Sequence, residues 1–173
     1  MIKLKYIFID GYNVIHSWPK LKKIKDYNYD SARKELLDVL HNYATFNHCK
    51  IYLVFDAHKV KGNMENKQTE GNITIVFTKD GETADAFIER TMDEIGKKVE
   101  VTVVTSDWLE QQTIFQRGAI RMSSLEFYNE VLNIEDIIRS KTEKCNRDSK
   151  KNLLEDRLDE SVWTKLESIR RGK

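Results

Sequence analysis

The stretch Tyr6-Ile7-Phe8-Ile9-Asp10-Gly11-Tyr12-Asn13 decides the fold, because a short hydrophobic run stops abruptly at an aspartate and a glycine. Such a run, bounded by a turn signal, predicts a buried β-strand over residues 4–10. The aspartate stands where the strand ends, and the glycine allows backbone to pass close to a ligand. Asp-Gly is also a common turn pair without any chemistry, and that alternative stays open here.

The same pattern recurs further along the chain. Ile51–Phe55 is followed by Asp56, and Val101–Ser106 is followed by Asp107. The predicted strands are 4–10, 50–55, 73–77, 99–105 and 119–122, and the predicted helices are 30–46, 82–95, 108–116 and 124–141. Residues 11–29 and 57–72 are predicted as loops. Strands that alternate with helices are typical of parallel βαβ units, so the sequence predicts an α/β fold.

The chain of 173 residues fits one domain with an appendage. We place the domain at residues 1–141. The charged, weakly periodic segment that follows predicts a linker, and Val162, Trp163, Leu166 and Ile169 predict a short amphipathic helix over 161–169. Residues 142–173 are therefore expected to be a charged linker with a short C-terminal helix.

Composition excludes several classes of protein. The formal net charge is +1, so any binding of nucleic acid has to come from local basic runs. Cys49 and Cys145 fit no metal-ligand spacing, and no apolar run approaches the roughly 20 residues of a membrane span. No signal peptide is recognisable, so we expect a soluble cytoplasmic protein without a membrane partner. Nucleotide-binding P-loop, dinucleotide-binding and nucleophile-elbow motifs are missing.

Acidic residues mark the predicted site. In a parallel α/β sheet the carboxyl ends of the strands share one edge, so Asp10, Asp56 and Asp107 are expected to meet there. Asp85, at the start of the helix that follows another strand, should face the same crevice. Clustered carboxylates repel one another unless a cation or a proton is present. Oxygen ligands suit Mg²⁺, and metal ions held by such a cluster can activate water for attack on a phosphodiester.

Each acid also has an ordinary structural explanation. Asp85 could act only as a partner of its helix dipole, and Asp107 could only cap the helix predicted after it. Asp56 could be a ligand or a supporting group, and His58 could act as a base, although a lone histidine at a strand end is more often a surface residue. Glu82 shares a helix face with Asp85, and Ser106 places a hydroxyl beside Asp107.

Taken together and in order, these segments resemble the YacP-like branch of the NYN-domain family over residues 4–140. The matching pieces are Ile9–Ile15, Val54–His58, Phe77-Thr78, Glu82–Asp85 and Thr105–Asp107. The resemblance implies a PIN-like fold of three layers, with helices on both faces of a mainly parallel sheet.

The resemblance also implies an activity, an endoribonuclease that depends on Mg²⁺ or Mn²⁺. It assigns Asp10, Asp85 and Asp107 to the metal site, with Asn13 and Asp56 as further catalytic residues and Glu82 in an outer position. It further implies single-stranded mRNA as substrate and the ribosome as the place where the mRNA is presented. Ribosome association is a hypothesis from the resemblance alone.

An RNA strand that approaches an acidic site needs cations beside it. The candidates for RNA binding are Lys20, Lys22, Lys23, Lys59, Lys61, Lys67, Arg117 and Arg121. Tyr12, Trp18 and Trp108 could stack on bases. The alternatives are solvated surface charges for the lysines and core anchors for the tryptophans.

Two other functions compete with the nuclease interpretation. A nuclease-like domain that binds RNA or the ribosome without cutting would have tended to lose one of its acids. A phosphatase of another α/β fold would favour an Asp-x-Asp motif after the first strand, which Asp10-Gly11-Tyr12 does not supply.

Overall fold

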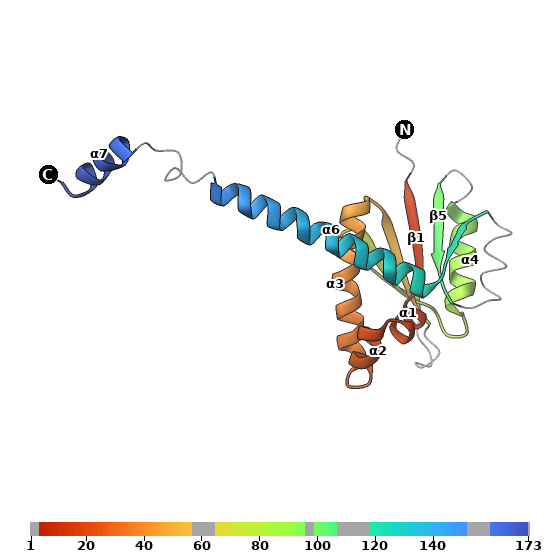
Figure 1. Cartoon of the computed structure of the whole chain (residues 1–173). Helices are drawn as coiled ribbons and strands as arrows, with labels where there is room; N and C mark the ends of the chain where they lie inside the picture. The colour runs from red at the N-terminus through yellow and green to blue at the C-terminus, as the bar shows by residue number, and fades with distance from the viewer. Residues whose placement is uncertain (1–3, 57–64, 96–98, 107–117, 152–159, 173) are drawn as a thin grey trace. The chain divides into compact units, whose positions relative to one another are not determined.

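The structure is a computed structural model that describes residues 4–56, 65–95, 99–106, 118–151 and 160–172 (Figure 1). The described residues fall into two compact units, one that ends at Ile134 and one that begins at Glu135. The first unit holds the sheet and the predicted site, and the second holds the remainder of a long helix and a short terminal helix. Within the described residues, no helix is long and apolar enough to cross a membrane.

A six-stranded sheet with the strand order β3-β4-β2-β1-β5-β6 forms the centre of the first unit. Its strands are β1 (Lys5–Asp10), β2 (Lys50–Phe55), β3 (Asn66–Glu70), β4 (Ile73–Phe77), β5 (Glu100–Val104) and β6 (Ile120–Met122). β1 pairs in parallel with both β2 and β5, while β3 pairs antiparallel with β4 at one edge. The fold class is therefore mixed α/β with a mostly parallel sheet, as predicted.

Helices cover both faces of this sheet. The helix α4 (Ala84–Ile95) packs through Phe87 and Ile88 against Phe8 and Val54. Because side chains alternate along a strand, Ile7 and Ile9 face the other way. That second face is covered by α1 (Gly11–Ser17), α3 (Tyr29–Asn47) and the first turns of α6 (Ser124–Lys151), with α2 (Pro19–Lys25) packed on α3. Figure 1 shows α4 and α3 on opposite sides of the sheet.

Several predicted boundaries differ from the structure. The segment 11–29 is not a loop: Asp10 caps α1, and Pro19 begins α2 at a position where its missing N–H is not needed. β3 lies inside the segment predicted as the loop 57–72, whose residues 57–64 lie outside the described ones. α6 continues to Lys151, so residues 142–151 are helical rather than a linker.

The terminal helix is present as α7 (Glu160–Arg170), close to its predicted bounds. The helix predicted over 108–116 lies outside the described residues. α6 was underestimated because its second half is charged and weakly periodic, and the predicted stop at residue 141 relied on that loss of period.

Candidate active site

Asp10 joins the central strand to the first helix. It is the last residue of β1, and its Oδ1 accepts a hydrogen bond from the backbone N–H of Asn13 at 3.1 Å, which caps α1. The carboxylate therefore lies at the positive end of a helix dipole. A Cβ atom on Gly11 would lie 2.3 Å from Cε1 of Phe55, so a side chain at this position would collide with that ring.

Three of the predicted acids belong to elements that reach this edge of the sheet. Asp56 directly follows β2, the hydrogen-bonded neighbour of β1, and Asp85 lies in the first turn of α4, which packs on both strands. The pKa of Asp10 is raised from 3.8 to about 6: burial raises it most, the backbone N–H of Asn13 lowers it, and the carboxylates of Asp85 and Asp56 also raise it. The carboxylates of Asp85 and Asp56 are therefore each near enough to Asp10 to act on its charge.

The donor set at this edge suits a hard divalent cation. Crowded carboxylates that resist ionisation are stabilised as anions by a positive ion among them. Within the described segments, no complete group of three or more histidine, cysteine or acidic ligands is present. Mg²⁺ usually takes only one or two carboxylates and keeps several water molecules, so the acids at the edge fit it without such a cage. Asp107, predicted as a third ligand, lies outside the described residues, and its neighbour Ser106 is exposed.

Asn13 is held by the start of α6. Its Oδ1 accepts a hydrogen bond from Ser124 Oγ at 2.8 Å and a longer one from Ser17 Oγ at 3.5 Å. The indole N–H of Trp18 donates to the carbonyl oxygen of Ser124 at 2.9 Å, and Trp18 is only 3% exposed. Trp18 is therefore a core anchor rather than a base-stacking residue. Sequence reasoning missed Ser124, which lies 111 positions from Asn13 and has no local signal.

The carboxylate of Glu82 is bound by an arginine. Arg90 contacts Glu82 Oε1 at 3.1 Å and Glu65 Oε2 at 2.8 Å, and the Glu82 side chain is only 8% exposed. Thr78 Oγ1 donates to the Glu82 carbonyl at 2.7 Å. These contacts fix the turn that leads into α4, and hence the position of Asp85. Arg90 follows Glu82 by eight residues, and this spacing within the helix predicted over 82–95 is the signal that could have revealed the pair, although α4 begins only at Ala84.

The predicted RNA-binding residues are spread over several elements. Lys20, Lys22 and Lys23 are exposed on α2, where Lys20 pairs with Glu35. Lys67 is exposed on β3 and pairs with Glu65 at 2.7 Å, and Arg121 is exposed on β6. The described residues do not include His58, Lys59, Lys61, Trp108 and Arg117.

A group of aromatic and cationic side chains that sequence reasoning missed lies beside the acids. The guanidinium of Arg33 lies 5.8 Å from the ring centroids of both Phe55 and Phe77, which are the last residues of β2 and β4. Tyr12 packs edge-on against Phe55 at 5.2 Å and against Tyr29 at 5.9 Å. Phe55 is buried and the other three rings are half-buried, and together they surround Arg33 at the same edge of the sheet as Asp10. The sequence does not reveal this group, because only the packing of α3 against the sheet places Arg33 beside these rings.

Comparisons with known proteins agree with this architecture. The model of the YacP-like NYN domain family matches residues 7–171. YacP of Bacillus subtilis (strain 168) is 38% identical over 167 residues, which cover 96% of this chain and 96% of YacP. The crystal structure of Rae1 (YacP) from Bacillus subtilis is 36% identical, with a TM-score of 0.71 over 96% of this chain and 95% of that one. A second crystal structure, of a tryptophan-to-leucine mutant of Rae1 (YacP), gives a TM-score of 0.73 at 33% identity over 83% and 85% of the two chains.

Proposed function

The chain belongs to the YacP-like NYN domain family, and from this membership and the acidic edge of its sheet we propose that it is a divalent-metal-dependent endoribonuclease. The family supports a nuclease-like, RNA-related function. The proposal goes further, to Mg²⁺ or Mn²⁺ as the cofactor and single-stranded RNA as the substrate.

One observation supports the proposal best: Asp10, Asp56 and Asp85 converge at the carboxyl edge of the sheet. In open α/β sheets the ligand crevice lies at that edge. The Asp10 side chain is half-buried and is affected by the two other carboxylates, so it is poorly stabilised as an anion by protein groups alone. A cation held by Asp10 and Asp85, with Asp107 as the predicted third ligand, removes that repulsion.

The chain's own residues then have distinct tasks. Bound Mg²⁺ or Mn²⁺ would supply a more acidic water and neutralise charge on the phosphate. The Asn13 N–H binds Oδ1 of Asp10 and so fixes the direction of the carboxylate, which would hold the cation together with Asp85. Asp56 is placed to accept a proton or to hold a water beside the site. Asn13, locked by Ser124, orients the start of α1 under the substrate phosphate.

The flanks of the acids suit a flexible single strand. Tyr12 offers a half-buried ring for base stacking, which single-stranded RNA readers use widely. Arg33 and the exposed lysines of α2 offer positive charge for the phosphates that continue away from the acids. The substrate in this proposal is mRNA, and its presentation on the ribosome is carried over from the family resemblance.

The proposal is tested by incubating the purified protein with labelled single-stranded RNA, both naked and in translating ribosome complexes. Mg²⁺ and Mn²⁺ are supplied separately, and EDTA serves as the control. We expect internal cuts with either metal and none with EDTA. Cutting confined to the ribosome complexes would make presentation by the ribosome part of the mechanism.

Two other results of this experiment would indicate a function other than cleavage of RNA. Retained binding of RNA or ribosomes, with no cutting in either format and with either metal, would make the chain a binding module. Turnover of a simple phosphomonoester without any cutting of RNA would instead indicate a phosphatase.

A further inference from the structure

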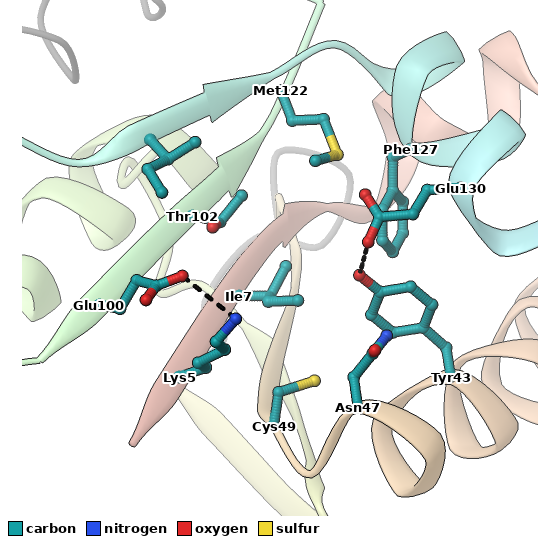
Figure 2. A pocket seen from close by; sticks show the side chains of 11 residues that line it. Lys5, Ile7, Tyr43, Asn47, Cys49, Glu100, Thr102, Met122, Phe127 and Glu130 are labelled. Carbon is teal, nitrogen blue, oxygen red and sulfur yellow. Dashed lines mark hydrogen bonds and ion pairs between the residues drawn. The ribbon is translucent and has the colours of Figure 1, made fainter. Parts of the chain in front are cut away.

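A cavity of about 210 Å³ lies at the opposite edge of the sheet from the acids. Lys5 and Glu100, the first residues of β1 and β5, stand on one side of it, and Tyr43 and Asn47 of α3 on another (Figure 2). Lys5 and Asp10 are the two ends of β1, so the cavity and the acids are separated by about 17 Å at the usual rise of a strand. The cavity is therefore distinct from the proposed active site.

The cavity contains hydrogen-bonding groups that the protein does not use. Asn47 Nδ2 is buried and has no well-formed hydrogen bond to a described residue, although it is near enough to the Tyr43 hydroxyl to lower the pKa of that group. Glu130 accepts a hydrogen bond from the Tyr43 hydroxyl through Oε1 at 2.6 Å, and the described part of the chain supplies no cation to pair with this carboxylate. A buried donor without a partner is costly, so native structures usually satisfy it with water or a ligand.

The remaining walls are apolar and aromatic. Ile7 forms part of the base on β1, and Phe127 and Tyr43 form an edge-to-face pair with centroids 5.0 Å apart. Thr102 adds a hydroxyl from β5. A few polar groups among apolar walls are typical of small-molecule sites, and a cavity of this size is below the usual range for drug-sized ligands. It fits a single planar ring system.

The polar groups define the edge that the ring system must present. A carboxylate accepts two N–H donors side by side, and the neighbouring amide N–H₂ of Asn47 needs an acceptor, for which a carbonyl oxygen is suited. Among the RNA bases, guanine carries a ring N–H and an exocyclic N–H₂ next to a carbonyl on its Watson–Crick edge. Uracil and cytosine lack the pair of adjacent donors, and adenine lacks the carbonyl.

We propose that this cavity, lined by Asn47, Glu130 and Thr102, binds one guanine base. Glu130 accepts from the two N–H donors of the base, and Asn47 Nδ2 donates to its carbonyl oxygen. The ammonium of Lys5, which is half-exposed at the rim and pairs with Glu100 at 3.4 Å, stands where an attached phosphate would leave the cavity. The same chemistry is offered by a free guanine nucleotide and by a guanosine within an RNA strand.

Calorimetric titration of the full chain with GMP, AMP, CMP and UMP tests the base. We expect one saturable site for GMP and binding weaker by at least about tenfold for the other three. Titration with the trinucleotides UGU and UAU, of which UAU lacks guanine, separates the two sources. Tighter binding of UGU than of GMP identifies a guanosine within RNA as the ligand. Binding of GMP that is at least as tight as that of UGU identifies a free nucleotide. Absence of saturable binding of both GMP and UGU up to about 5 mM would overturn the proposal, as would tighter binding of another mononucleotide.

Three variants locate the site. Glu130→Gln keeps an oxygen for the Tyr43 hydroxyl but replaces half of the acceptor with a donor, and Asn47→Ala removes the unpaired amide. Each should weaken GMP binding by about tenfold or more, while Asn42→Ala, an exposed asparagine on the same helix, should leave it unchanged. Asp10→Asn should bind GMP as the parent does. Unchanged GMP binding in both Asn47→Ala and Glu130→Gln, or its loss in Asp10→Asn, would contradict a site in this cavity.

Discussion

Asp10 combines two roles that make opposite demands on its charge. As the cap of α1 it accepts the Asn13 N–H, which favours the carboxylate, whereas burial and the carboxylates of Asp85 and Asp56 favour the neutral acid. Burial is the largest of these effects, so the pKa of Asp10 rises to about 6. Without a cation, an ionised Asp10 is therefore a source of instability in the folded protein.

This imbalance predicts how stability depends on pH in the metal-free protein. Because folding raises the pKa from 3.8 to about 6, the folded state binds more protons in that interval. The free energy of unfolding therefore falls as the pH rises from 3.8 to about 6 and beyond, by about 3 kcal/mol at most. Asp10→Asn keeps the cap and removes the charge, so in EDTA near pH 7.5 it should be more stable than the parent, with the difference shrinking toward pH 4.

Urea unfolding followed by circular dichroism measures this effect. Asp38→Asn, which changes an exposed acid on α3, is the matched control and should show no such difference. Adding Mg²⁺ should stabilise the parent but not Asp10→Asn. An Asp10→Asn protein that is less stable than the parent in EDTA at neutral pH would contradict this account.

Gly11 is required by packing rather than by backbone conformation. A Cβ at this position would overlap the ring of Phe55, which is only 1% exposed and cannot move away easily. Gly11→Ala should therefore lower the free energy of unfolding by about 1–3 kcal/mol. In a double-mutant cycle, the loss should be smaller in a Phe55→Leu background, where the ring is gone. Equal losses in the two backgrounds would show that Phe55 is not the obstacle.

At the scale of elements, α4 is tied to the edge of the sheet by one arginine. Arg90 binds the buried carboxylate of Glu82 and, at the same time, Glu65 just before β3. It also lies 5.2 Å from the ring centroid of Phe87. Loss of this arginine leaves Glu82 charged and buried without its partner, which is more destabilising than loss of an exposed pair.

Arg90→Gln should lower the free energy of unfolding by about 1–3 kcal/mol, and Glu82→Gln should abolish most of that loss in the double mutant. Glu94→Gln is the matched control, because Glu94 pairs with the same arginine at 3.7 Å but is 63% exposed. Its effect should stay within about 0.5 kcal/mol. Chemical denaturation of the three single variants and the double mutant measures these free energies. Additive effects of Arg90→Gln and Glu82→Gln would show that the two residues are not coupled.

The elements that could be predicted from sequence are those with a strong local signal. β2 and β4 have the predicted bounds, because their apolar runs are closed by turn residues. β3 was missed because all of its residues are exposed, so pairing with β4 rather than burial keeps it extended. The helices α1 and α2 were missed because each has 7 residues and shows too few turns for a period to emerge.

At the scale of the whole molecule, topology explains why part of the site could be predicted. Asp10 and Asp56 end neighbouring parallel strands, so their meeting follows from the strand pattern. Ser124, Arg90 and Arg33 could not be inferred in the same way, because contacts such as Ser124 with Asn13 and Arg33 with Phe77 depend on how distant elements pack. The cavity at the opposite edge of the sheet has no sequence signal at all.

The proposed activity also belongs to this scale, since it needs the acids of β1, β2 and α4 together. The most direct test compares Asp85→Asn with Asp93→Asn in single-turnover cleavage of labelled single-stranded RNA with Mg²⁺ or Mn²⁺, on ribosome complexes if naked RNA is not cut. Asp93 is an exposed acid on the same helix, so both variants lose one negative charge from α4. We predict a loss of at least about a hundredfold for Asp85→Asn and a near-parental rate for Asp93→Asn, with both variants folded. Parental cleavage by folded Asp85→Asn would contradict the acidic site.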